Sequence, residues 1–191
     1  MKILQWGYQS PASENYIRSL KGNTIKLPLT RLNPSIFIGS LEEAKNVEIL
    51  KSNDIQCVIN LTRHNLNLTS STDIECQNQY LSLKSFCSLM QTLPQCLEAI
   101  EKAIDRNLKL AIVCRDGFTK TMTAISAYYV LKYNTDYTEV RDQLKALVPD
   151  IAPYFNPEYE QHLRKISNMI QNRTKKSPSL RRCSSKQSKS N

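Results

Sequence analysis

The chain has 191 residues, of which 40% are hydrophobic and 23% charged, and these values are typical of a globular protein. This length suits one domain of about 150 residues with a single hydrophobic core, plus a tail. There is no run of about 18 apolar residues that would span a membrane, and the apolar run near the N-terminus is too short for a secretory signal. We therefore expect an intracellular protein, in the cytoplasm, the nucleus or both.

The formal net charge of +9 is unevenly placed along the chain. Residues 172–191 contain seven of the 26 basic residues and no acidic one, which leaves 19 basic against 17 acidic residues elsewhere. Because this end is rich in Ser, Lys and Arg and nearly free of apolar residues, residues 171–191 are predicted to form a disordered basic tail. Nucleic acid and anionic membranes are hypothetical partners of this tail alone.

The six cysteines do not form a metal-binding pattern. They contain no Cys-x-x-Cys pair and have no histidine partners at metal-ligand spacing. We therefore expect no metal site and no cofactor, and most of the thiols to be reduced.

The first part of the chain predicts a strand, a helix and a second strand after an N-terminal extension, residues 1–30. Residues 33–40 contain a short β-prone run that Gly39 is expected to stop, and residues 41–52 carry apolar side chains at helical spacing. Residues 55–61 are an almost unbroken β-branched run, which is typical of a strand covered on both faces of a sheet. This order predicts a right-handed parallel unit.

The middle of the chain predicts one more strand and one more helix. Residues 63–78 are polar and indicate a surface loop, and residues 79–83 alternate in the manner of a strand. Residues 85–91 are expected to form a loop, followed by a helix over residues 93–106.

The last part of the chain predicts two helices. Residues 137–147 have an amphipathic pattern, with Thr135 or Thr138 as the capping residue. A final helix is expected to begin at Pro157, since proline suits the first helical turn. Together the predicted elements indicate an α/β fold with a central, mainly parallel sheet that is flanked by helices.

The stretch around Cys114 carries the most specific chemistry in the sequence. The apolar, β-prone residues 110–113 end in Cys114, a short loop contains Gly117, and a helix-period segment opens at Thr121. Loop N–H groups and the positive end of the helix dipole converge on one point, which favours an anion or a thiolate there. Since open α/β sheets bind ligands at the carboxyl ends of their strands, the functional site is expected at Cys114.

This loop resembles the phosphate-binding loop of the cysteine-dependent protein tyrosine phosphatase superfamily, written His-Cys-x-x-Gly-x-x-Arg-Ser/Thr. In that family the cysteine is the nucleophile, the arginine and loop amides hold the phosphoryl group, and an upstream aspartate protonates the leaving oxygen. The resemblance implies that Cys114 occupies the nucleophile position, that Lys120 replaces the arginine, and that Thr121 assists the thiolate. It also implies a phosphate-binding loop made of Cys114, Arg115, Asp116, Gly117, Phe118, Thr119 and Lys120.

A second stretch resembles the dual-specificity branch of the same superfamily. Domains of that branch open with a proline, a short strand, Gly-Ser, a helix and a strand similar to Val-x-Asn-Leu-Thr. The corresponding residues here are Pro34, Gly39, Ser40, Val58, Asn60, Leu61 and Thr62. The resemblance covers residues 31–170, which are therefore interpreted as a dual-specificity phosphatase-like domain.

Three departures from the family pattern predict impaired catalysis. Val113 stands at the histidine position, Lys120 stands at the arginine position, and residues 84–97, where the family carries its general acid, contain no acidic residue. Losing a well-placed charged donor costs about 10²- to 10³-fold in rate. Losing a general acid costs a further 10²- to 10⁴-fold or so. Asp116 also opposes the groups that would ionise Cys114, so the sequence leaves the state of this thiol open.

Three functions remain as alternatives. The first is a regulatory pseudophosphatase that binds phosphorylated proteins or a kinase or phosphatase partner. The second is a weakly active cysteine-dependent protein phosphatase. The third is a phosphoinositide or anionic-lipid binder that uses the pocket together with the basic tail. Asp116 is either a turn or salt-bridge residue or a mark of kinship with lipid-phosphatase loops, some of which resemble Cys-x-Asp-Gly-x-x-Arg-Thr.

Overall fold

A computed structural model describes residues 29–68, 73–148 and 157–176. The expectations for residues 1–28 and 177–191 lie outside these described residues. Within them, no helix is both long enough and apolar enough to cross a bilayer. The elements, in chain order, are β1 (Thr30–Arg31), β2 (Ile36–Ser40), α2 (Leu41–Lys45), α3 (Val47–Ser52), β3 (Cys57–Asn60), β4 (Glu75–Asn78), α4 (Phe86–Asp105), β5 (Leu110–Cys114), α5 (Thr119–Tyr133), α6 (Tyr137–Leu147) and α7 (Pro157–Lys176).

The strands form one sheet with the order β1-β2-β5-β3-β4. The short β1 is antiparallel to β2, and the other neighbours are parallel. In the register of the sheet, Cys114 at the end of β5 lies beside Ser40 of β2, and Val113 lies beside Asn60 of β3. The prediction of a central, mainly parallel sheet is therefore confirmed, and the carboxyl ends of its parallel strands meet at one edge.

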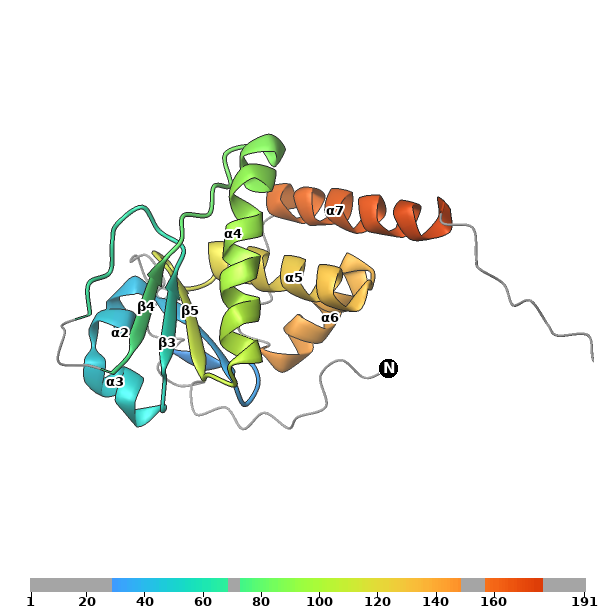
Figure 1. Cartoon of the computed structure of the whole chain (residues 1–191). Helices are drawn as coiled ribbons and strands as arrows, with labels where there is room; N and C mark the ends of the chain where they lie inside the picture. The colour runs from blue at the N-terminus through green and yellow to red at the C-terminus, as the bar shows by residue number, and fades with distance from the viewer. Residues whose placement is uncertain (1–28, 69–72, 149–156, 177–191) are drawn as a thin grey trace, which may run out of the picture.

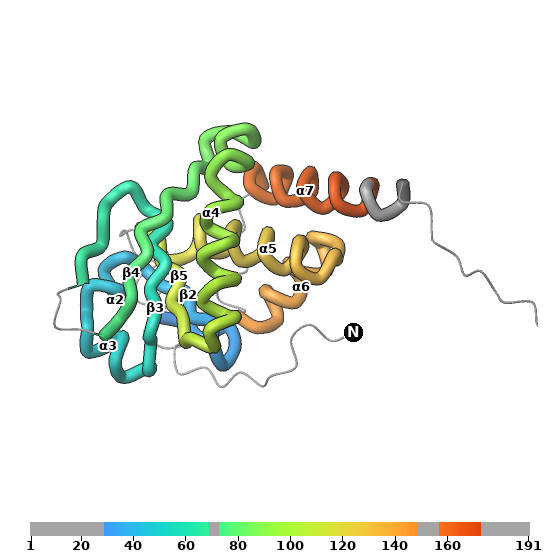
Figure 2. The backbone as a smooth tube through the Cα atoms, in the orientation of Figure 1, coloured from blue at the N-terminus to red at the C-terminus, as the bar shows by residue number. Residues whose placement is uncertain are grey.

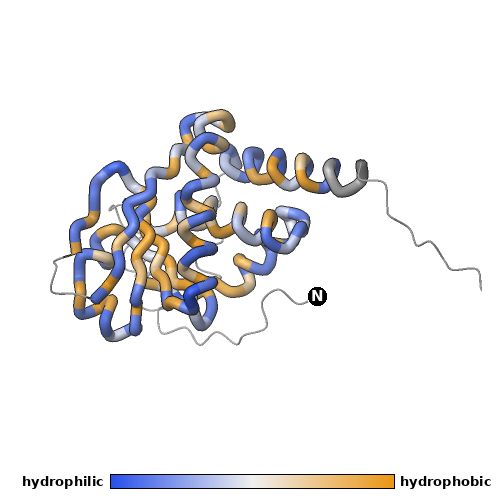
Figure 3. The backbone as a smooth tube through the Cα atoms, viewed as in Figure 1, coloured by the Kyte–Doolittle hydropathy of each residue, from blue (hydrophilic) through white to orange (hydrophobic). Residues whose placement is uncertain are grey.

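Helices cover both faces of this sheet (Figures 1 and 2). The side chains of Leu110, Ile112 and Cys114 point into the larger core cluster, which they share with α4, α5, α6 and α7. The intervening side chains of Ala111 and Val113 point to the other face, where α2 and α3 pack. Because every β5 side chain is buried on one face or the other, the strand reads as an unbroken apolar run (Figure 3).

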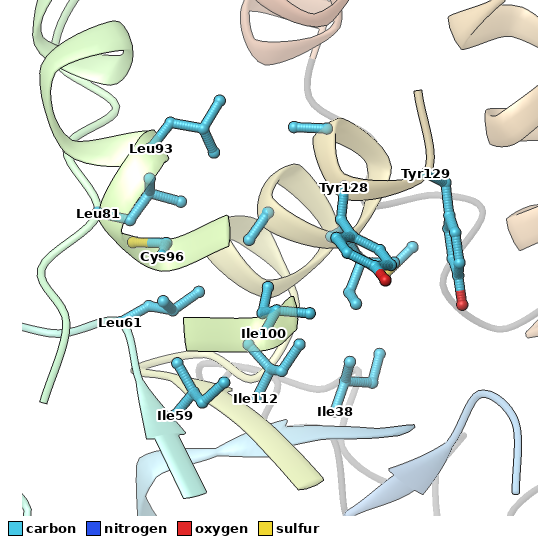
Figure 4. Packing of buried hydrophobic residues seen from close by; sticks show 14 of the residues in the cluster. Ile38, Ile59, Leu61, Leu81, Leu93, Cys96, Ile100, Ile112, Tyr128 and Tyr129 are labelled. Atoms are coloured by element: carbon cyan, nitrogen blue, oxygen red, sulfur yellow. The ribbon is translucent and has the colours of Figure 1, made fainter. Parts of the chain in front are cut away.

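The larger core is formed by strand residues of one face and by the helices above it. Figure 4 shows Ile38, Ile59 and Ile112 from three neighbouring strands pointing toward Ile100 of α4 and Tyr128 of α5. Helix α5 is buried along residues 121–130, since the sheet lies on one side of it and other helices on the other. This buried helix places the loop that precedes it against β2, where Gly117 approaches the backbone of Ser40.

The predicted helix over residues 41–52 is wrong in one respect: it is two short helices. Asn46 separates them with an extended backbone, and its side-chain oxygen accepts hydrogen bonds from the N–H groups of Glu48 and Ile49. An Asn side chain competes well for backbone N–H groups at a helix start, so the chain caps a new helix there. The strand that Gly39 was expected to stop also continues, through Ser40, which caps α2.

Two expectations for the middle of the chain are also wrong. The third predicted strand lies at Glu75–Asn78 rather than at residues 79–83, because the backbone of this earlier segment pairs with β3. Residues 85–91 are not a loop: α4 begins at Phe86, where Ser85 and Ser88 form a reciprocal capping box. Pro94 lies inside this helix rather than in its first turn.

The predicted helix over residues 137–147 is confirmed, but its cap is not. Asp136 is the capping residue, and its carboxylate accepts a hydrogen bond from the N–H of Thr138 at 2.7 Å. The last helix begins at Pro157 as expected and runs to Lys176, so it passes through residue 170, where the domain was expected to end. Residues 171–176 are therefore helical rather than part of a disordered tail.

Candidate functional site: the Cys114 loop

The loop between β5 and α5 consists of residues 115–118 and joins a buried strand to a buried helix. Gly117 has a φ of 87°, in the left-handed region that favours glycine. A Cβ atom at this position would also lie 2.9 Å from the backbone nitrogen of Ser40. Both the turn and the close approach of β2 therefore require glycine here.

The Asp116 side chain points into the loop, where its carboxylate accepts hydrogen bonds from the loop's donors. Its Oδ1 accepts hydrogen bonds from the backbone N–H groups of Phe118 and Thr119, each at 3.1 Å. Its Oδ2 accepts a hydrogen bond from the Thr119 hydroxyl. Asp116 thus makes the contacts of a turn residue, and its carboxylate lies at the N-terminus of α5, where the helix dipole and the first N–H groups favour a negative charge.

The Cys114 thiol is only 1% exposed and donates a hydrogen bond to Oδ1 of Asp116 at 3.0 Å. Burial, followed by the negative charge of Asp116 and this hydrogen bond, raises the pKa of the Cys114 thiol to about 12. The backbone N–H groups of Lys120 and Thr121 act in the opposite direction but more weakly. Cys114 is therefore a protonated thiol at neutral pH in this arrangement.

The carboxylate partner of this pair is ionised. Burial opposes ionisation of Asp116, but the hydrogen bonds that it accepts outweigh burial and hold its pKa below the ordinary value. The donors are the Cys114 thiol, the Thr119 hydroxyl and two loop N–H groups. The loop thus contains one negative charge, and it resides on Asp116 rather than on Cys114.

The Thr121 hydroxyl does not support a thiolate in this arrangement. It donates a hydrogen bond to the carbonyl oxygen of Gly117 at 2.9 Å, and it lies 4.0 Å from Sγ of Cys114. Its proton therefore stabilises the first turn of α5.

The Lys120 side chain lies against the end of β3. Its Nζ donates a hydrogen bond to the carbonyl oxygen of Leu61 at 3.1 Å and lies 4.6 Å from the ring centroid of Tyr80. Burial lowers the pKa of Lys120, Tyr80 and Cys114 oppose this shift, and the nearby positive charge of Arg63 adds to it more weakly. The guanidinium carbon of Arg63 lies 4.8 Å from the centroid of the same tyrosine ring.

Sequence reasoning missed Arg63 and Tyr80 as neighbours of Lys120. Arg63 directly follows the Val-x-Asn-Leu-Thr stretch, and Tyr80 follows β4, so both residues are next to segments with recognisable patterns. No pattern in the sequence shows that these two side chains meet, because the contact depends on how β3 and β4 pair.

The segment that was expected to supply a general acid forms the start of α4 instead. The first turn of this helix contains no acidic residue. The ring centroids of Phe86 and of His162 on α7 lie 5.7 Å apart. Burial lowers the pKa of this histidine. Val113, at the family's histidine position, is fully buried on the opposite face of the sheet, among apolar side chains.

This arrangement offers three kinds of chemical group at one edge of the sheet. They are a protonated thiol, a carboxylate that occupies two loop N–H groups, and two cations beside a tyrosine ring. Within the described ranges, no group of three or more His, Cys, Asp or Glu side chains could hold a metal ion.

Curated relatives match part of this chain in sequence. Human dual specificity protein phosphatase 6 is 24% identical over 125 residues, a match that covers 64% of this chain and 32% of the relative. Human dual specificity protein phosphatase 16 is 26% identical over 131 residues, which cover 66% of this chain and 19% of the relative. The chain therefore matches about a third or less of the length of these relatives.

Solved structures share the fold. Human DUSP28 has a TM-score of 0.62 at 19% identity, with 78% of this chain and 99% of that chain covered. The human tyrosine phosphatase-like serine/threonine/tyrosine-interacting protein has a TM-score of 0.60 at 12% identity, with coverages of 75% and 98%. The family model described as "Dual specificity phosphatase, catalytic domain" matches residues 36–169. The chain therefore belongs to the dual specificity phosphatase family.

Proposed function

We propose that this chain is a catalytically impaired dual specificity phosphatase domain that acts as a regulatory, phosphoprotein-binding pseudophosphatase. One observation carries the proposal: the Asp116 carboxylate accepts hydrogen bonds from the Cys114 thiol and from two loop N–H groups. The nucleophile is thereby kept as a thiol, and donors that would hold a phosphoryl group already have an anion. The proposed setting is the cytoplasm or the nucleus.

The energetic argument starts from the nucleophile. A cysteinyl-phosphate intermediate requires a thiolate, and a thiol with a pKa of about 12 is ionised to roughly one part in 10⁵ at pH 7. An incoming phosphate dianion would also meet the negative charge of Asp116. Both effects act before the first chemical step, so they reduce turnover whichever substrate is offered.

The two remaining parts of the family machinery reinforce this conclusion. Lys120 donates to the carbonyl oxygen of Leu61, and its single ammonium group does not reproduce the arginine fork. The start of α4 contains no acidic residue to protonate a leaving group. The partners that fit this proposal are phosphorylated proteins, or a kinase or phosphatase, for which this chain would compete with its active relatives.

A weakly active cysteine-dependent phosphatase is the second candidate. The N–H groups of Lys120 and Thr121 point at the sulfur of Cys114 and lower its pKa, which is the direction catalysis needs. An aryl phosphate with a low-pKa leaving group would need little acid assistance. The lipid-binding alternative depends on the basic tail, most of which lies outside the described residues.

The test is hydrolysis of an aryl phosphate by the full chain beside Cys114→Ser, Asp116→Ala and the double variant Asp116→Ala with Lys120→Arg. We expect the wild type to match Cys114→Ser, and the double variant to gain turnover that disappears when Cys114 is also replaced. Wild-type turnover above about 1 s⁻¹ that requires Cys114 would overturn the proposal in favour of an active enzyme.

A further inference from the structure

Two positive charges share one aromatic ring at the carboxyl end of β3. Nζ of Lys120 lies 4.6 Å from the ring centroid of Tyr80, and Cζ of Arg63 lies 4.8 Å from it. Their elements are separate: Arg63 follows β3, Tyr80 follows β4, and Lys120 is in the first turn of α5. The tertiary fold alone brings these three side chains together.

Within the described part of the chain, neither cation has a carboxylate partner. Other basic side chains there do: Lys109 lies 2.9 Å from Asp54, and Arg106 lies 2.6 Å from Glu75. No described Asp or Glu oxygen lies within 4.0 Å of the charged nitrogens of Arg63 or Lys120. Two neighbouring positive charges without an anion repel one another, and a bound dianion would relieve this repulsion.

The position of Arg63 is held by a network of hydrogen bonds between β3 and β4. The Asn60 side chain donates to the carbonyl oxygen of His64 at 2.7 Å and to Oδ1 of Asn78 at 2.8 Å. Its own oxygen accepts hydrogen bonds from the backbone N–H and the hydroxyl of Thr62. The turn that carries Arg63 is therefore fixed before any ligand arrives, which lowers the entropic cost of binding.

Both cations keep donors for a ligand. The ammonium group of Lys120 has three donors, and the structure describes one acceptor for it within the protein, the carbonyl oxygen of Leu61. The guanidinium group of Arg63 offers five donors in a planar fork, and its side chain is exposed. A phosphate monoester carries about two negative charges and three terminal oxygens, which suits two cations on different elements better than a carboxylate does.

We propose that Arg63, Tyr80 and Lys120 form an oxyanion site for the phosphate monoester of a phosphoprotein, displaced from the Cys114 loop. The loop contains its own anion in Asp116, so the ligand's phosphate binds beside β3 instead. This inference rests on the proposed function, because it assigns phosphate binding to Lys120, at the arginine position, together with Arg63 and Tyr80 from outside the loop, instead of to the loop N–H groups.

The test is titration of the full chain with inorganic phosphate and with free phosphotyrosine, followed by calorimetry or by amide chemical shifts. Arg63→Gln and Lys120→Met should each weaken binding about tenfold or more, since each removes a charge-assisted hydrogen bond. The matched control is Lys165→Met, because Lys165 also lies over an aromatic ring, that of Phe86, at 5.5 Å. This control should bind as the wild type does.

Three outcomes would overturn the oxyanion site. The first is that the wild type shows no detectable binding. The second is that Arg63→Gln and Lys120→Met both melt as the wild type does and bind phosphate with wild-type affinity. The third is that Lys165→Met loses as much affinity as they do. If the loop were the site, Asp116→Ala would strengthen binding and Arg63→Gln would leave it unchanged. Fast turnover together with binding through Arg63 would reject the proposed function alone, whereas a silent enzyme whose phosphate binding needs neither Arg63 nor Lys120 would reject this site alone.

Discussion

At the scale of single residues, the Cys114 and Asp116 pair determines the chemistry of the loop. The carboxylate lies where two loop N–H groups and the dipole of α5 converge, so the site is electrostatically satisfied without a ligand. The same carboxylate accepts a hydrogen bond from the Cys114 thiol. The loop N–H groups and the helix dipole, which would favour a thiolate, therefore stabilise the negative charge of Asp116 instead. This competition involves two side chains two positions apart, and its outcome depends on the rotamer of Asp116.

Replacing Asp116 by Asn should make Cys114 more reactive. The amide oxygen can still accept from the N–H groups of Phe118 and Thr119, but the negative charge that raises the pKa of Cys114 is gone. We expect the alkylation rate of Cys114 by iodoacetamide at pH 8 to rise about tenfold, the change that one pKa unit produces. The readout is mass spectrometry of the Cys114 peptide, with the exposed Cys87 as an internal reference. An unchanged rate would show that burial alone controls the thiol.

Replacing Gly117 by Ala should destabilise the domain. The positive φ strains a side chain, and the added Cβ would meet the backbone of Ser40 at 2.9 Å. Strain of this kind costs about 1–3 kcal/mol, which urea unfolding would measure as a lower midpoint. Gly39→Ala is the control. The closest contact of its added Cβ would be the flexible end of the Leu29 side chain, so this variant should lose less stability. An equal loss of stability in the two variants would contradict the requirement for glycine at position 117.

At the scale of elements, helix ends explain where the structure departs from the sequence patterns. Hydrophobic spacing predicted one helix over residues 41–52 and a helix from residue 93. Asn46 and Ser85 instead cap helices at positions that apolar spacing does not mark. A local side-chain hydrogen bond to the backbone decided the boundary in both cases, whereas the existence of each helical segment followed from its apolar positions.

Replacing Asp136 by Ala should weaken the junction between α6 and α7. Its carboxylate caps α6 through the N–H of Thr138 and also accepts a hydrogen bond from the Ser167 hydroxyl of α7 at 3.3 Å. Loss of such a cap costs about 0.5–2 kcal/mol. Hydrogen exchange of the first α6 amides should speed up. Asp136→Asn should retain most of the protection, and equal effects of the two variants would contradict a capping role.

At the scale of the whole molecule, the parallel sheet assembles the site from distant segments. Cys114 lies beside Ser40, and Val113 beside Asn60, because β5 is the central strand. The edge where these strands end then receives Lys120 from α5 and Tyr80 from beyond β4. This long-range pairing explains why the loop could be located from sequence while its neighbours could not.

The stability of the domain should be highest between about pH 5 and pH 9. Hydrogen bonds and ion pairs lower the pKa values of Glu75, Asp116 and Asp136 below ordinary values of 3.8 to 4.5, so their stabilisation is lost as the pH falls below that range. Burial raises the pKa values of Cys57 and Cys114 from 9.0 to about 12, so their stabilisation is lost as the pH rises above 9. Urea midpoints at pH 3.5, 7 and 10 would check both limits, and a midpoint that rises at either extreme would contradict them.

The sequence by itself determined the family, the mainly parallel sheet and the position of the Cys114 loop. Each of these depends on local signals: apolar runs for strands, Gly117 for the turn, and the order of motifs along the chain. Only the tertiary structure decided the state of the site. The direction of the Asp116 carboxylate, the burial of the thiol and the contact of Lys120 with Tyr80 depend on packing between segments, and no pattern along a single chain encodes distances between side chains on different elements.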